Sequence, residues 1–193
     1  MKRIALLAAV AVLIGIADAG AATRGSLSPY ISGKVGFAHT GLIAGNLSNL
    51  NGAGFHGAVG AAYQANPYVV VRQELELSYS PQWGDSSGFG DAFYAPWAGM
   101  ANMYLDFGDC NIRPYIGAGL GVGEVHLRWQ DAVHNLYRYD HSAFNWGLYA
   151  GLNFDLTRDL VADLGVRYTR AEVIGHPGEF QTFEATLGLR YQF

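Results

Sequence analysis

Apolar and polar residues alternate along most of the chain. In the segment Thr182–Phe193 the odd positions are Phe, Ala, Leu, Leu, Tyr and Phe, and the even positions are Thr, Glu, Thr, Gly, Arg and Gln. Successive side chains of a β-strand point to opposite faces, so this period of two predicts a strand with one wholly apolar face. The same pattern recurs and predicts eight strands: Ile31–His39, Phe55–Tyr63, Val69–Tyr79, Trp97–Phe107, Tyr115–Val122, Asn145–Leu156, Leu160–Thr169 and Thr182–Phe193.

The connections between these strands alternate between short and long. The short ones contain residues suited to tight turns: Asn66–Pro67, Asp109–Asn111 and Thr157–Asp159. The long ones are Gly41–Gly52, Pro81–Phe93, Trp129–His141 and Ile174–Phe180. An even number of strands with short turns at one end and long loops at the other predicts an up-and-down antiparallel barrel.

The apolar face of such a barrel points either inward, as in a soluble ligand carrier, or outward into lipid. The polar face carries Gly117, Gly119 and Gly121 in succession, and small residues suit the narrow interior of an eight-stranded barrel. Aromatic residues gather at the strand ends, as in the girdles of membrane barrels. At the short-turn end these are Tyr63, Phe107, Tyr115, Phe154, Tyr191 and Phe193, and at the long-loop end Phe37, Phe55, Tyr79, Trp97, Trp146, Tyr168 and Phe183. The sequence therefore predicts an all-β, eight-stranded antiparallel transmembrane β-barrel with its apolar face in lipid.

The start of the chain has the features of a secretory signal peptide. Lys2 and Arg3 precede an uninterrupted small or apolar run, Ile4–Ala17, which is too short to cross a bilayer as a helix. We expect residues 1–22 to be the signal peptide, with cleavage after Ala19 or Ala21, and residues 23–193 to form the barrel. Charged residues make up only 15% of the chain, and the net charge is -4, which excludes a polybasic nucleic-acid binder.

Four segments resemble the small Gram-negative outer-membrane β-barrel superfamily, which includes OmpA-like transmembrane domains and opacity-type surface antigens. The segments are Pro114–Gly121, Phe144–Leu152, Asp163–Tyr168 and Leu189–Phe193. The resemblance implies export to the bacterial outer membrane, contact with outer-membrane lipid and lipopolysaccharide, and recognition of the terminal Phe193 by the barrel-assembly machinery. It implies no cofactor and no nucleic-acid partner.

The predicted strand faces turn a set of charged residues toward the lumen. These are Lys34, Arg72, Glu74, Glu76, Asp106, Asp163, Arg167, Glu184 and Arg190. Charges of both signs in a narrow interior should pair, because an unpaired ion there would lose its hydration without compensation. We therefore expect a plugged lumen, and a barrel that anchors surface loops for envelope integrity or adhesion. A narrow passive channel is the alternative, and a lipid A-modifying enzyme is the third possibility.

The third long connection carries aromatic and Arg residues of the kind that anchor interfaces: Trp129, His134, Tyr137, Arg138 and Tyr139. They are candidate contacts for a host or surface ligand.

Residues in and near the third and fourth long connections are also considered for metal binding and for catalysis. His134, His141 and His176, with Asp140 and Glu179, have no tight ligand spacing, so no metal site is predicted. Asp140-His141-Ser142 sets a base beside a hydroxyl, but adjacent strand residues face opposite ways, so no catalytic site is predicted.

Overall fold

The computed structural model describes residues 27–42, 50–86, 90–130, 136–175 and 179–193. The predicted signal peptide, residues 1–22, lies outside these ranges. None of the described residues forms a helix long and apolar enough to cross a membrane.

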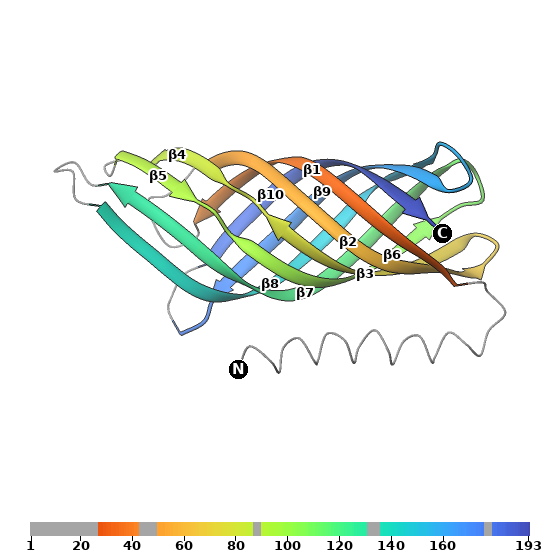
Figure 1. The fold of residues 1–193 in the computed structure, drawn as a ribbon, viewed down its shortest axis with the longest axis horizontal. Coiled ribbons are helices and arrows are strands. Elements are labelled where there is room, and N and C mark those ends of the chain that lie inside the picture. Colours follow the sequence, from red (N-terminus) through yellow and green to blue (C-terminus); the bar gives the residue numbers. More distant parts are fainter. Residues whose placement is uncertain (1–26, 43–49, 87–89, 131–135, 176–178) are drawn as a thin grey trace.

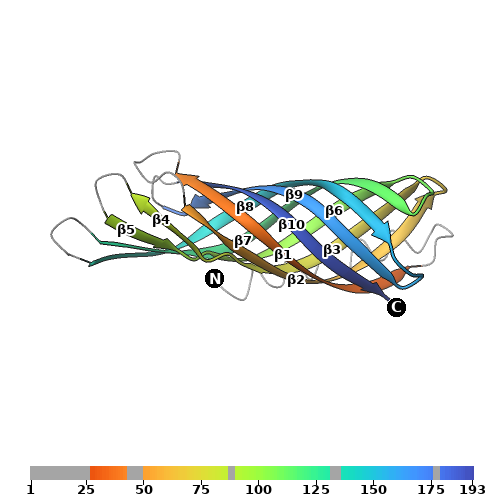
Figure 2. The same ribbon diagram turned by 90° about the horizontal axis from the view of Figure 1, so that it is seen from above.

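The described residues form one antiparallel sheet that closes on itself. The strands are β1 (Ser28–Leu42), β2 (Leu50–Asn66), β3 (Val69–Tyr79), β4 (Gln82–Ser86), β5 (Gly90–Tyr94), β6 (Trp97–Phe107), β7 (Ile112–Gln130), β8 (Leu136–Asp155), β9 (Leu160–Val173) and β10 (Glu179–Gln192). β1 pairs with β2 on one side and with β10 on the other, with Ile31 opposite both Val59 and Tyr191. This double pairing leaves no free edge (Figures 1 and 2).

The ten strands make up eight walls of the barrel, because β4 continues β3 and β5 continues β6. Each break contains a proline, Pro81 or Pro96, which has no N–H for a ladder hydrogen bond. The backbone remains bonded at the breaks, where the N–H of Ser80 donates to the carbonyl of Pro96 (3.1 Å). The prediction of an eight-stranded antiparallel barrel is confirmed. The expected loop Pro81–Phe93 is wrong, because a β-hairpin of β4 and β5 occupies most of it.

The two ends of the barrel differ as expected. The turns between β2 and β3, β6 and β7, and β8 and β9 lie at one end with the start of β1 and the C-terminus, and the longer connections lie at the other (Figure 1). The short turns use predicted residues: Asn66 accepts a hydrogen bond from the N–H of Tyr68 (2.8 Å), and the Thr157 hydroxyl accepts one from the N–H of Leu160 (3.0 Å). Gly108, directly before the predicted turn Asp109–Asn111, has a positive φ of 104°.

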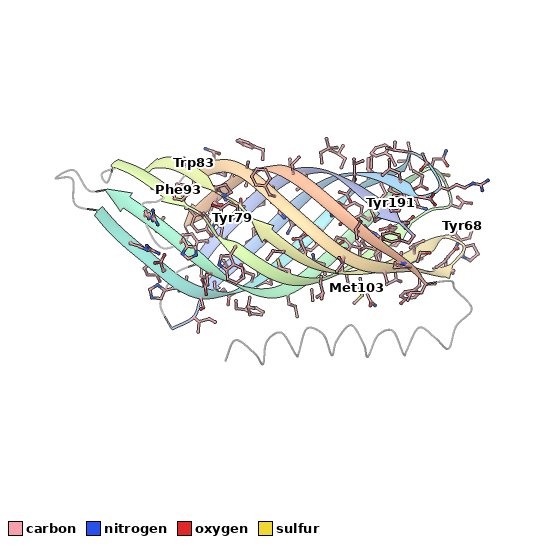
Figure 3. The ribbon with its side chains drawn as sticks, in the orientation of Figure 1. Tyr68, Tyr79, Trp83, Phe93, Met103 and Tyr191 are labelled. Atoms are coloured by element: carbon pink, nitrogen blue, oxygen red, sulfur yellow. The ribbon has the colours of Figure 1, made fainter. Side chains whose placement is uncertain are left out.

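The outward face is apolar across the middle of the barrel. Val35, Val166 and Leu187 are exposed there, at 55%, 60% and 60%, while the polar residues between them are buried. Aromatic residues flank this band: Figure 3 shows Tyr68 and Tyr191 at the short-turn end and Tyr79 toward the other. One predicted girdle residue is wrong. Tyr115 is 4% exposed and faces the lumen, as its own strand face requires.

Above the outer aromatic girdle the apolar residues change faces. In β7, Ile116 and Leu120 point outward, but Val125 and Leu127 are buried inside, while His126 and Arg128 face out. The inversion recurs where Leu50, Ala143, Val173 and Phe180 are buried in β2, β8, β9 and β10. Several strands therefore run further than the sequence pattern predicted, into the expected loops.

Candidate functional site

All nine charged residues assigned to the lumen have buried side chains. They are Lys34, Arg72, Glu74, Glu76, Asp106, Asp163, Arg167, Glu184 and Arg190, each 8% exposed or less. Together with buried tyrosine, histidine and asparagine residues they form a network, the lumen network, to which all eight walls contribute. The nine charged residues are four cations and five carboxylates.

The part of the network nearer the long connections centres on Arg167 of β9. Its two terminal nitrogens donate to the two carboxylate oxygens of Glu76 (2.8 and 2.7 Å), which lies on β3 across the barrel. His56 of β2 is bonded through Nε2 to Glu184 of β10 (2.8 Å) and stands 3.5 Å from Glu76 through Nδ1. A planar guanidinium held bidentately by a carboxylate is a strong and directional interaction, so it ties opposite walls together.

Glycine makes room for this cluster. A Cβ on Gly36 of β1 or on Gly54 of β2 would collide with the Glu184 carboxylate. These glycines thus let the Glu184 side chain of β10 lie flat across the neighbouring walls β1 and β2.

The part of the network nearer the short turns is held by two aspartates. Arg72 Nε donates to both Asp106 oxygens (2.9 and 2.8 Å), and Arg190 Nη2 stands 3.9 Å from Asp106. Lys34 Nζ is 3.7 Å from Asp163. Although β1 and β10 are neighbours, Lys34 pairs with Asp163 of β9, Glu184 with His56 of β2 and Arg190 with Asp106 of β6.

Uncharged donors that the sequence interpretation omitted complete the network. Glu74 accepts hydrogen bonds from the hydroxyls of Tyr30 (3.0 Å) and Tyr104 (2.8 Å). Tyr115 donates to Asp163 (3.0 Å), and the Arg72 guanidinium lies over the Tyr104 ring at 4.4 Å.

The signal that could have found these residues is strand parity. Tyr30 lies on the same face of β1 as Lys34, which was assigned to the lumen. His56 of β2 is directly opposite Lys34. They were absent from the predicted lumen set because that set contained only residues with a formal charge.

Above the lumen network the interior is mostly apolar, although the polar side chains of Thr40 and Gln82 are fully buried at the same level. Buried side chains from six strands form this upper core: Leu50, Ala92, Tyr94, Val125, Leu127, Ala143, Ala171, Val173 and Phe180. The rings of Tyr94 and Phe180 stack at 4.8 Å, and Tyr139 packs against the cluster. Its members come from strand segments beyond the outer girdle, so it fills the end of the barrel that carries the long connections.

Four of the five candidate loop contacts lie on strands. Trp129 lies on β7, and Tyr137, Arg138 and Tyr139 lie on β8, because the β7–β8 hairpin extends to Gln130 and Leu136. The side chains of Trp129 and Tyr137, and the whole of His134, lie outside the described residues. Arg138 is exposed on the outer wall, whereas Tyr139 faces the upper core.

The outer wall beyond the girdle carries paired charges. His126 of β7 is bonded through Nδ1 to Asp140 of β8 (2.7 Å), and Arg138 Nε also donates to Asp140. These hydrogen bonds, that of His126 first, hold the pKa of Asp140 below its ordinary value. Arg170 forms an ion pair with Glu179 in the same way.

The residues weighed for metal binding and catalysis are spread apart. Asp140 faces outward while His141 stacks on Tyr139 inside (3.9 Å between ring centroids), and Ser142 is exposed on the opposite face from His141. Within the described ranges no three His, Cys, Asp or Glu side chains gather in a way that could hold a metal ion. His134 and His176 lie outside those ranges.

Comparison with known proteins assigns the chain to a family. A family model described as "Outer membrane protein beta-barrel domain" matches residues 7–193. The chain belongs to this outer-membrane β-barrel family. It is accordingly a protein of the bacterial outer membrane, with short turns toward the periplasm and long connections toward the exterior.

Solved structures of this type of barrel include surface proteins and an enzyme. Neisserial surface protein A superposes with a TM-score of 0.62 at 19% identity, covering 87% of this chain and 99% of that one. Ail, the attachment invasion locus protein of Yersinia pestis, gives 0.53 at 15% identity, with 89% and 100% covered. The outer membrane enzyme PagL gives 0.55 at 16% identity, with 81% and 97% covered. These likenesses establish the fold.

A curated sequence relative covers part of the chain. An uncharacterised protein of Brucella abortus (strain 2308) is 34% identical in a match of 84 residues that covers 38% of this chain. The match spans 30% of the length of that relative.

Proposed function

We propose that this barrel is a sealed, non-catalytic anchor that holds its outer hairpins rigidly above the membrane. The observation that carries the proposal is the succession of two different fillings along one interior. The charged lumen network spans the membrane-embedded part, and the apolar upper core follows it toward the exterior.

Each filling opposes ion flow for a different reason. In the network, Arg167 and Glu76 bridge walls that are not neighbours, so an ion would have to break a bidentate charged pair to pass. In the upper core, Leu50, Val125 and Phe180 offer no polar group to replace the hydration shell of an ion. An ion that passed the first barrier would still meet the second.

The same upper core supports a display role. It gives the strands beyond the girdle an interior of their own, so that β7 and β8 remain paired through Gln130 and Leu136. The β7–β8 hairpin is thereby paired up to the two residues that flank 131–135. We infer that this hairpin meets whatever surface ligand the protein has.

Planar-bilayer recording of the refolded mature chain tests the seal. Folding is verified on the same sample by the mobility shift between unheated and boiled gel lanes. We expect no steady single-channel openings from the folded barrel. Regular openings would overturn the proposal and favour the narrow channel, and altered lipid A mass spectra on overexpression would favour an enzyme.

Display is tested by exchanging residues 131–135 for a short Gly–Ser turn and measuring whole-cell binding to host surfaces. The exchange leaves Tyr139 and the upper core in place, whereas deleting residues 131–139 would also remove part of that core. Loss of binding with unchanged surface abundance is expected. Unchanged binding would remove this hairpin from the proposal.

A further inference from the structure

Four outward-facing side chains form a cross-strand row beyond the outer girdle. Trp83 of β4 is opposite Phe93 of β5, Phe93 is opposite Arg128 of β7, and Arg128 is opposite Arg138 of β8. The Trp83 and Phe93 rings lie 5.5 Å apart, and Figure 3 shows both at the end that carries the long connections. The row crosses three interstrand spacings, about 14 Å. We call it the aromatic–arginine row.

The arginine half of the row is electrostatically unfavourable on its own. Like charges placed directly opposite each other on a sheet destabilise it. Arg138 donates to Asp140 through its Nε. Arg128 has no ion pair among the described residues, and the next outward position on β7 toward the membrane is His126, which pairs with the same Asp140. An anion between Arg128 and Arg138 would relieve the repulsion.

A shallow apolar groove lies on the lipid-facing wall below Trp83. Its volume is about 440 Å³, and it is lined by lipid-facing residues that include Val35, Phe55, Leu77 and Tyr79. Its floor is open because Gly57 faces outward, where an added Cβ would meet nothing within 4 Å. Tyr79 ends β3, and Trp83 lies on β4, the continuation of the same wall. The groove and the row are therefore consecutive along the barrel surface.

Together the two features match the chemistry of a phosphorylated, acylated saccharide. Aromatic rings pack against sugar rings, guanidinium groups bind phosphate bidentately, and a groove in the bilayer holds an acyl chain. The row faces sideways from the barrel wall, on strand segments just beyond the outer aromatic girdle. We propose that this wall binds lipopolysaccharide of the surrounding leaflet, with phosphate on Arg128 and Arg138, sugar on Trp83 and Phe93, and an acyl chain in the groove. This assignment rests on the orientation in the proposed function, with the long connections outside.

Native mass spectrometry of the refolded mature chain with purified lipid A tests the phosphate contact. The probes are diphosphorylated lipid A and its fully dephosphorylated form. The double variant Arg128→Gln/Arg138→Gln should bind diphosphorylated lipid A roughly tenfold or more weakly, because charge-assisted hydrogen bonds to phosphate are lost. It should bind the dephosphorylated form as the unaltered chain does. The matched control Arg113→Gln/Arg158→Gln removes two guanidinium groups at the periplasmic end and should change neither affinity.

A second variant tests the groove separately. Gly57→Leu fills the groove from its floor and should weaken binding of lipid A several-fold, but not binding of the deacylated, phosphorylated saccharide. Gel mobility shifts verify that every variant is folded. Equal affinities for the unaltered chain and the Arg128→Gln/Arg138→Gln variant would overturn the proposal.

A sulfated oligosaccharide in solution tests the other source of the same chemistry. If it binds through Arg128 and Arg138 more tightly than lipid A does, and Gly57→Leu has no effect, the occupant is a soluble anionic glycan and the lipopolysaccharide assignment is wrong. The outcome is independent of the bilayer recording. A conducting barrel that loses lipid A with the arginine variant would refute the sealed anchor and leave this site standing.

Discussion

The embedded and outer parts of this barrel share strands but have opposite interiors. Within the membrane, β7 directs Ile116 and Leu120 outward, at 53% and 62% exposure, and its inward face is polar or glycine. A few residues on, Val125 and Leu127 face inward at 1% and 5%, and His126 faces out. The period of two continues and only its phase changes. The surrounding medium, lipid or water, therefore decides which face of a strand is apolar.

The two parts must also be stabilised differently. The outer part buries apolar side chains away from water, so the hydrophobic effect favours it as in a soluble β-sandwich. The embedded part gains nothing comparable from its polar interior. It depends on hydrogen bonds and charge pairs that satisfy groups already removed from water. Substitutions on the inward or outward face of the embedded or outer part should therefore distinguish hydrophobic stabilisation from stabilisation by polar pairing.

The largest effect is expected in the lumen network. Arg167→Met removes the cation that Glu76 binds bidentately and leaves this buried carboxylate with only His56 beside it. Breaking a buried pair in this way costs about 3–5 kcal/mol. Urea unfolding of the chain refolded into lipid vesicles measures it. The double variant Arg167→Met/Glu76→Met should recover much of the loss, and a single variant as stable as the unaltered chain would show that the network is not structural.

The next effect contrasts the outward faces of the two parts. Leu187 lies midway between the girdle residues Phe183 and Tyr191 on β10 and is 60% exposed to lipid. Leu187→Arg should cost about 2–4 kcal/mol, the range for arginine at the bilayer midplane. Ser142→Arg, on the outward face of β8 beyond the girdle and opposite Glu124, should leave the unfolding free energy nearly unchanged. Equal costs at both sites would mean that the change of phase does not mark the membrane boundary.

The upper core should respond to loss of volume in the way a soluble core does. Leu127→Ala removes a side chain that is 5% exposed and should cost about 2–3 kcal/mol, within the range for large-to-small core substitutions. Hydrogen exchange should then rise in the outer parts of β7 and β8 while the embedded strands stay protected. Arg128→Ala, one residue away on the opposite face, is the control and should change exchange little.

Much of the fold follows from the alternation because lipid imposes a strict pattern. Eight strands, their faces and the short turns could all be predicted from it, down to Leu187 outward and Arg190 inward. The extensions beyond the girdle were missed for the same reason. A strand that changes phase between Val122 and Val125 looks like a strand that ends.

The candidate site was only partly predictable. Parity placed Arg167 and Glu76 on the inward face, but their pairing across the barrel depends on strand tilt and stagger, which the alternation does not encode. The aromatic–arginine row joins Trp83 to Arg138 through three strand pairings. It could not be foreseen while Pro81–Phe93 was taken to be a loop.

The smallest effect concerns an exposed pair on the outer wall. His126 donates to Asp140 and is the main reason that the pKa of this carboxyl lies below its ordinary value, so His126→Ala should move the pKa of Asp140 upward. Carbon-13 NMR of Asp carboxyl groups in the refolded chain measures the titration, with the Asp140 signal assigned by its loss in Asp140→Asn. A lowered pKa in the folded chain means that the pair contributes stability above the ordinary pKa of aspartate and loses that contribution as the pH falls through the lowered value. If the titration of Asp140 is unchanged in His126→Ala, Arg138 alone stabilises the Asp140 carboxylate. Arg138 would then be committed to Asp140 and less able to bind the phosphate of lipopolysaccharide.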